Sequence, residues 1–100
     1  MPPKQLSAPE LRRVIEQARI EGRVRESFHA SDEHPERNLS LDDVLAGLER
    51  ADWILESTEY DEKHKNWKYR IKTKDVEGDD LTILLTASQE TLSVKVITRW

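Results

Sequence analysis

The sequence predicts an α+β domain in which two helices pack on one face of an antiparallel sheet of four to five strands. Two amphipathic segments with capping-box starts lie in the first half of the chain. Four runs rich in aromatic, β-branched and threonine residues fill the second half. With a short strand between the helices, the predicted order is α-β-α-β-β-β-β. The length of 100 residues fits one domain, and the absence of cysteine excludes disulfides.

The first helix is expected to begin after Ser7, beyond a disordered tail over residues 1–6, so that the folded domain spans residues 7–100. Ser7 and Glu10 form a capping box, and Gly22 suits the left-handed position that ends a helix. The apolar stripe of this helix is Leu11, Val14, Ile15 and Ala18.

The segment after the first helix alternates over residues 23–29, which predicts a strand with Arg25, Ser27 and His29 on one side. A polar loop over residues 30–38 follows. The second helix is predicted over residues 41–51, with a capping box formed by Ser40 and Asp43. Its apolar stripe is Leu41, Val44, Leu45 and Leu48, interrupted only by the mild cost of Gly47.

Four further strands are predicted over residues 53–58, 66–74, 81–87 and 92–100. The linkers between them are short and polar. Hairpins are therefore expected rather than crossover helices, and the four strands should form a consecutive antiparallel meander.

The charge of the chain is uneven. The net charge of −4 argues against binding nucleic acid by bulk attraction, which draws on a basic surplus or a basic patch. Residues 1–30 carry six basic and four acidic groups, residues 31–64 carry three and eleven, and residues 65–100 carry seven and five. The acidic groups are concentrated in the middle, so a local basic surface remains compatible with this composition.

Four motifs carry a family resemblance. They are Phe28-His29-Ala30, the run E-R-N-L-S-L-D-D-V over residues 36–44, the run W-K-Y-R-I over 67–71, and V-I-T over 96–98. The pattern covers residues 24–100 and resembles a family of small bacterial proteins defined only as a domain of unknown function. Such domains look like distant relatives of the RelE and BrnT ribonuclease toxins of toxin–antitoxin pairs. That resemblance implies a small sheet packed against two helices, with messenger RNA cut on the open face of the sheet.

The resemblance carries over only His29 and Arg37, as motif positions without an assigned role. Family members often have a further Arg between the two, where this chain reads S-D-E-H-P, and RelE-type toxins are usually basic. Both departures count against ribonuclease activity. By its chemistry His29 suits general acid or base catalysis, but a His at a strand end also serves as a hydrogen-bonded structural residue. For Arg37, the alternative is a local ion pair with Asp42 or Asp43.

A basic stripe is the second candidate feature. Lys68, Arg70 and Lys72 alternate with residues of the opposite face, so the three cations should share the open side of one strand. Lys95 and Arg99 extend the row if the last strand alternates regularly. Such a stripe is the electrostatic footprint of RNA binding. The alternative is an ordinary solvated face, on which lysines also prevent edge-to-edge aggregation.

Other site classes find little support. His29, Asp32 and His34 are close in sequence, but their spacing matches no helical His pair and Pro35 indicates a loop, so no metal site is expected. No cofactor is expected either, because the chain has no glycine-rich phosphate loop. The first 20 residues lack the features of a signal peptide and no stretch is long and apolar enough to span a bilayer, so the expected location is cytoplasmic, without membrane contact.

Two functions from different classes remain. The first is a metal-independent messenger-RNA endoribonuclease of a toxin–antitoxin pair, using His29, Arg37 and the basic stripe on the sheet face. The second is a protein-interaction module without strong catalysis, which binds an antitoxin-like partner through its acidic middle, residues 42–62, or through the first helix. The acidic balance favours the interaction module, and the basic face favours the ribonuclease. No oligomeric state is predicted.

Overall fold

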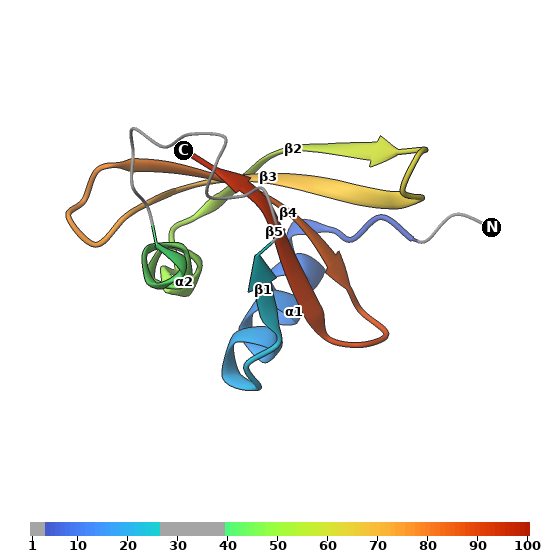
Figure 1. Cartoon of the computed structure of the whole chain (residues 1–100), viewed down its shortest axis with the longest axis horizontal. Coiled ribbons are helices and arrows are strands. Elements are labelled where there is room, and N and C mark those ends of the chain that lie inside the picture. The colour runs from blue at the N-terminus through green and yellow to red at the C-terminus, as the bar shows by residue number, and fades with distance from the viewer. Residues whose placement is uncertain (1–3, 27–39) are drawn as a thin grey trace.

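The computed structural model describes residues 4–26 and 40–100 and confirms the α+β class (Figure 1). Two helices and five strands follow one another in the described part of the chain. They are α1 (Ala8–Ile20), β1 (Val24–Glu26), α2 (Leu41–Glu49), β2 (Ile54–Asp61), β3 (Asn66–Lys74), β4 (Asp80–Ser88) and β5 (Ser93–Arg99).

The strands form one sheet in the order β1-β5-β4-β3-β2. The meander from β2 to β5 is antiparallel, as predicted, whereas β1 pairs with β5 in parallel. The expectation of a purely antiparallel sheet is therefore wrong. Short hairpin linkers predict only the pairing of consecutive strands. They do not predict the pairing of β1 with β5, because the paired residues are about 70 positions apart in the sequence. The chain then passes through α2 to β2 at the opposite edge of the sheet.

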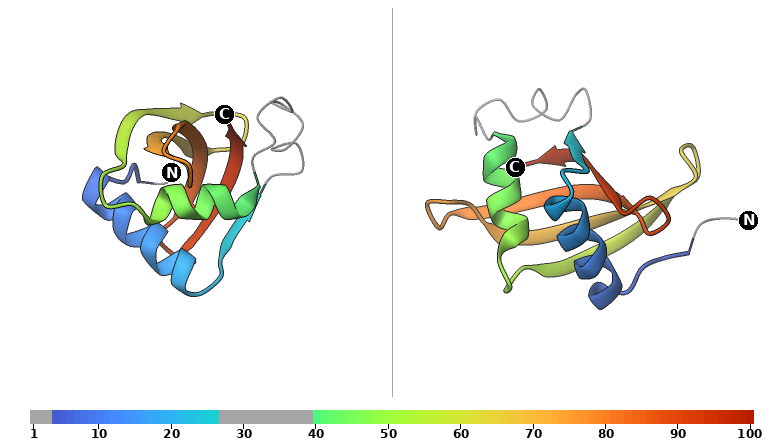
Figure 2. Two further views of the ribbon diagram at one scale, coloured as in Figure 1. Left: turned by 90° about the vertical axis from the view of Figure 1, so that its left-hand side faces the viewer. Right: turned by 90° about the horizontal axis from the view of Figure 1, so that it is seen from below.

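Both helices lie against the same face of the sheet, as Figure 2 shows. The predicted stripe of α1 is buried, and α2 buries Val44, Gly47 and Leu48. Facing them is a set of sheet residues that are all nearly inaccessible to solvent. This set comprises Tyr69, Ile71, Leu81, Ile83, Leu85, Val94 and Val96. We call the opposite side of the sheet the open face, since neither α1 nor α2 covers it.

Both predicted capping boxes are present. The backbone N–H of Glu10 donates to Ser7 Oγ at 3.3 Å, and Ser7 N–H donates to Glu10 Oε1 at 3.0 Å. Ser40 and Asp43 make the same reciprocal bonds at the start of α2. Gly22 has a positive φ of 70°, in keeping with its predicted position after α1. Helix α2 ends at Glu49, two residues before the predicted end, because Arg50 adopts an extended conformation.

The prediction of a disordered tail over residues 1–6 is wrong for Leu6. This side chain is only 3% exposed and belongs to the core. Its backbone N–H donates to the hydroxyl of Tyr69 at 2.9 Å, which ties the segment before α1 to strand β3. The folded domain therefore begins before residue 7, and Leu6 contributes a buried apolar side chain that the capping motif at Ser7 did not reveal.

Gly47 allows α2 to approach the sheet closely. A Cβ at this position would lie 2.8 Å from Thr73 Cγ2 and 3.1 Å from Leu81 Cδ2. In addition, the hydroxyl of Thr73 donates to the carbonyl oxygen of Gly47 at 2.7 Å. Gly47, which has a low intrinsic helix propensity, is thus the residue at which α2 contacts β3. Within the described residues, neither helix has the length and apolar character required to cross a membrane.

Candidate nucleic-acid interface

The predicted cations of β3 do share the open face. Tyr69 and Ile71 are buried against the helices, so the alternating residues Lys68, Arg70 and Lys72 point to the other side. Two of these cations are paired with carboxylates of β2. Lys68 Nζ lies 3.1 Å from Asp61 Oδ2, and Lys72 Nζ lies 3.4 Å from Glu56 Oε1. The β2–β3 half of the open face is therefore largely balanced in charge.

Arg70 has an aromatic neighbour instead. Its guanidinium lies 5.5 Å from the centre of the Trp100 ring, within cation–π distance. Trp100 reaches this position because its backbone exchanges two hydrogen bonds with Thr82, which extends the β4–β5 pairing by one residue. The sequence pattern predicts Trp100 in a strand, but nothing in that pattern assigns it to a site. An aromatic ring beside a cation on an open sheet face is the kind of platform on which nucleotide bases stack.

Arg99 does not belong to the stripe. Leu84 pairs with Thr98 and Leu85 with Val96, so Ile97 is an extra residue that forms a β-bulge. The bulge reverses the alternation, and Arg99 shares its side of the sheet with its partner Ile83. Arg99 is 4% exposed, and its Nη1 atom lies 3.1 Å from Glu26 Oε1. The expected position of Arg99 on the open face is therefore wrong, because regular alternation was assumed through the bulge.

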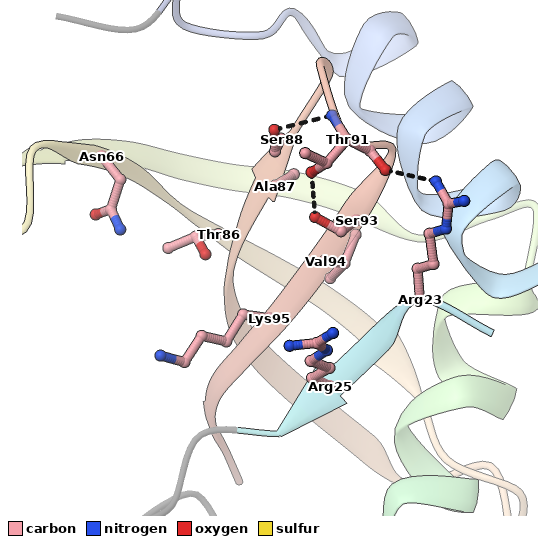
Figure 3. Close-up of a pocket in the computed structure, with 10 residues that line it drawn as sticks. All are labelled: Arg23, Arg25, Asn66, Thr86, Ala87, Ser88, Thr91, Ser93, Val94 and Lys95. Carbon is pink, nitrogen blue, oxygen red and sulfur yellow. Dashed lines mark hydrogen bonds between the residues drawn. The ribbon is translucent and has the colours of Figure 1, made fainter. Parts of the chain in front are cut away.

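Lys95 is exposed on the open face and has a neighbour that the sequence did not assign to the site. Its cross-strand partners are Arg25 on β1 and Thr86 on β4. Figure 3 shows the side chains of Arg25 and Lys95 extending from adjacent strands. Neither is paired with a carboxylate in residues 4–26 and 40–100. Arg25 was expected on one side of its strand together with His29, but only the parallel pairing of β1 with β5 places it beside Lys95.

The two cations line a groove of about 610 Å³ at the β1–β5–β4 side of the sheet (Figure 3). The remaining described lining residues are mostly hydroxyl, amide or small side chains, and none is acidic. They are Arg23, Asn66, Thr86, Ala87, Ser88, Thr91, Ser93 and Val94. The β4–β5 turn that closes one end is held by the Arg23 guanidinium, which donates to the carbonyl oxygen of Thr91 at 2.9 Å. The groove therefore combines positive charge with hydrogen-bonding groups.

A second polar cluster lies in the β2–β3 hairpin, where the sequence predicted a short polar linker. Nδ1 of His64 lies 2.7 Å from Asp61 Oδ2, the oxygen that also contacts Lys68. The backbone N–H groups of Lys63 and His64 donate to the other oxygen of Asp61 at 3.0 and 3.3 Å. The hydrogen bond with His64, followed by that with Lys68, holds the pKa of the Asp61 carboxyl well below its usual range.

The two motif residues, His29 and Arg37, lie outside the described residues. Their predicted roles therefore remain predictions. Among the residues that the structure describes, no group of three or more His, Asp or Glu side chains has the arrangement of a metal site.

The chain matches a known family over residues 27–99. The match begins just after β1 and includes α2 and the four-stranded meander, so α1 precedes it. Comparison with curated proteins and with solved structures gave no match. Because the matched segment covers most of the chain, the protein belongs to the family described as a domain of unknown function, DUF4258.

Proposed function

We propose that this domain binds single-stranded RNA across the open face of its sheet. The observation that carries the proposal is the pair Arg25 and Lys95, which are cross-strand neighbours without a carboxylate partner in the described part of the chain. Two adjacent exposed cations repel each other and gain little unless an anion lies between them. A phosphodiester backbone supplies such anions, and its binding releases condensed counterions.

The neighbouring side chains support RNA rather than an isolated anion as the ligand. Thr86 and the serines of the groove offer hydroxyl groups, which bond to phosphate and sugar oxygens. Trp100, next to Arg70 on the same face, offers a surface for a base. The basic area is small and lies next to the balanced β2–β3 half, which favours a short single strand over a long duplex. The resemblance to the RelE and BrnT toxins is consistent with this face as the RNA-binding side.

Titration of a fluorescently labelled single-stranded RNA, followed by anisotropy at several salt concentrations, tests the proposal. The double variant Arg25→Ala/Lys95→Ala should lower affinity at least tenfold. Since each phosphate contact on a single strand contributes about 0.7 to the salt slope, the slope of log K against log salt should fall by about 1.4. Lys72→Ala is the matched control, because this exposed lysine is already paired with Glu56. It should change affinity less than about twofold.

Two results would contradict RNA binding at this groove. One is the absence of any salt-dependent RNA binding by the wild-type protein. The other is a double variant that binds RNA with the affinity and salt slope of the Lys72→Ala control. Both variants replace exposed side chains, so circular dichroism should show an unchanged fold.

A specific observation also favours the second candidate, a protein-interaction module with an antitoxin-like partner. The ion pairs Lys68–Asp61 and Lys72–Glu56 neutralise two of the five cations of the predicted RNA-binding stripe. Helix α1, by contrast, is poorly suited to capture a partner, because its apolar stripe is already buried in the core. Two results together would favour this candidate over the first. A neighbouring gene product should co-purify with both the wild-type protein and the Arg25→Ala/Lys95→Ala variant, and the wild-type protein should not bind RNA.

A further inference from the structure

We infer that His64, oriented by Asp61, is the general base of an RNA-cleaving centre at the β2–β3 end of the open face. The inference rests on the proposed RNA binding and adds a catalytic residue to it. The sequence predicted only a short polar linker between these two strands, and the histidine that it offered for acid–base catalysis was His29.

The first support is the environment of Asp61. Its side chain is 15% exposed and has contacts from four directions: the His64 ring, the Lys68 ammonium and the backbone N–H groups of Lys63 and His64. All four favour the ionised carboxylate. Asp61 is therefore a fixed anion, and the hydrogen bond that it accepts requires a proton on Nδ1 of His64.

The second support is the tautomer of His64 that this hydrogen bond to Asp61 requires. With Nδ1 protonated and directed at Asp61, the neutral ring has its lone pair on Nε2, at the other side of the imidazole. The side chain is 62% exposed, so a bound ligand can reach Nε2. A carboxylate that holds a histidine in one tautomer and stabilises its protonated form is the arrangement used for proton transfer in hydrolytic triads. Here Asp61 is the positioning residue and His64 is the acid–base residue.

The third support is the position of this pair relative to the groove. Arg25 pairs with Lys95, and Lys95 pairs with Thr86. Tyr69 pairs with Leu85, so Lys68 and Thr86 are the next residues outward on β3 and β4. A row across the open face thus runs from the Arg25–Lys95 pair through Thr86 to Lys68. Lys68 contacts Asp61, which holds His64.

This row is short enough for one RNA segment to span it. Neighbouring strands are about 4.8 Å apart, so β1 and β3 are separated by roughly 14 Å across three strand spacings. An RNA with one phosphate at Arg25 and Lys95 can therefore place a following nucleotide beside Lys68 and His64.

The reaction that fits this arrangement is an internal transesterification. Nε2 of His64 takes the proton of a ribose 2′-OH, and the 2′ oxygen forms a bond to the adjacent phosphorus. The bond from phosphorus to the 5′ oxygen breaks, and that oxygen takes a proton from water. The hydroxide so formed accepts the proton from His64, which returns to its neutral state. The products are a 2′,3′-cyclic phosphate and a 5′-OH end, and the ammonium of Lys68, which also contacts Asp61, donates hydrogen bonds to the phosphorane oxygens.

Incubation of the full chain with a 5′-labelled single-stranded RNA in EDTA tests the inference. The wild-type protein should produce fragments that end in 2′,3′-cyclic phosphate. His64→Ala should cleave at least a hundredfold more slowly, the usual effect of losing an acid–base group, with unchanged RNA affinity by anisotropy. Lys63→Ala is the matched control in the same turn, since only its backbone N–H contacts Asp61. It should cleave at the wild-type rate.

Three outcomes overturn the inference. The first is a wild-type protein that binds RNA in a salt-dependent manner but does not cleave it, which leaves the proposed RNA binding intact. The second is His64→Ala cleaving at the wild-type rate. The third is the loss of cleavage in His29→Ala with normal cleavage in His64→Ala, which would assign the acid–base role to His29. An absence of both binding and cleavage would instead contradict the proposed function itself.

Discussion

Arg99 and Glu26 form an ion pair on the helix-covered side of the sheet, with Arg99 Nη1 3.1 Å from Glu26 Oε1. The pair joins β5 to its parallel neighbour β1. It exists because the bulge at Ile97 turns Arg99 away from the open face. A basic residue at the C-terminal end of a strand is thus buried in an ion pair instead of lying on the open face, where regular alternation would place it.

Removal of Glu26 should destabilise the protein. Glu26→Gln leaves the charge of the buried Arg99 without this carboxylate, and the free energy of unfolding should fall by about 3 kcal/mol, the lower end for a broken buried pair. Glu26 is partly exposed, which places the effect at that lower end. Urea unfolding monitored by tryptophan fluorescence measures the change.

Glu59→Gln is a suitable control for this experiment, because Glu59 is an exposed carboxylate on β2. It should change the free energy of unfolding by less than about 0.5 kcal/mol. The apolar double variant Glu26→Leu/Arg99→Met should recover most of the lost stability, since paired hydrophobic replacements of buried ions are often neutral. Equal stabilities of Glu26→Gln and Glu59→Gln would contradict a structural role for the ion pair.

Gly47→Ala should destabilise the protein, although the same change stabilises most helices by about 1 kcal/mol. The added Cβ would lie 2.8 Å from Thr73 Cγ2, and overpacking of this kind costs about 1–3 kcal/mol. The second variant Thr73→Ser removes that methyl group and keeps the hydroxyl that bonds to the Gly47 carbonyl. In urea unfolding, Gly47→Ala should therefore cost less in the Thr73→Ser background than alone. A stabilising effect of Gly47→Ala would argue against the close approach of α2 to β3.

Tyr69→Phe should release the segment before α1. The phenol oxygen accepts the hydrogen bond from the Leu6 backbone, and burial, as the largest cause, raises the pKa of the Tyr69 hydroxyl. Loss of this bond should cost about 1 kcal/mol and leave the Leu6 N–H without its partner. Hydrogen exchange should accelerate at the Leu6 amide. Tyr60→Phe is the control and should leave that amide protected. Unchanged exchange in Tyr69→Phe would show that burial of the Leu6 side chain alone holds the segment.

Acid should weaken the start of α1 through Glu10. The backbone N–H of Ser7, followed by the side chain of Lys4, lowers the pKa of Glu10 from 4.5 to about 2. A depressed pKa in the folded state means that this stabilisation is complete above pH 4.5 and is lost as the pH falls toward 2. Glu10→Gln should therefore show a smaller decrease in melting temperature over that pH range than the wild type. Parallel acid profiles of the two proteins would rule out this contribution.

Local sequence signals account for the helices and the meander. Each capping box is contained within four residues, and each stripe or alternation extends over one element, so neighbours in sequence are sufficient to predict them. The β3 residues show this well, because Tyr69 and Ile71 are buried while Lys68, Arg70 and Lys72 lie on the other face, as predicted.

Signals that depend on distant residues were missed. The bulge at Ile97 changes the side of the sheet on which Arg99 lies. The sequence of β5 alone does not predict this bulge, because the bulge depends on how β5 aligns with β4. Burial of Leu6 likewise depends on Tyr69, a residue 63 positions away. The Asp61–His64 hydrogen bond, by contrast, is local. Its signal in the sequence is an Asp followed three residues later by a His within a predicted hairpin linker.

The sequence by itself determined the α+β class, the two capped helices, the four-stranded meander and the cations of β3, because each follows from contacts between near neighbours. Only the tertiary structure decided the parallel pairing of β1 with β5, the burial of Arg99 and the groove at Arg25 and Lys95. These features arise where strands far apart in the chain come into register. That register depends on the packing of the whole core, and no segment encodes it alone.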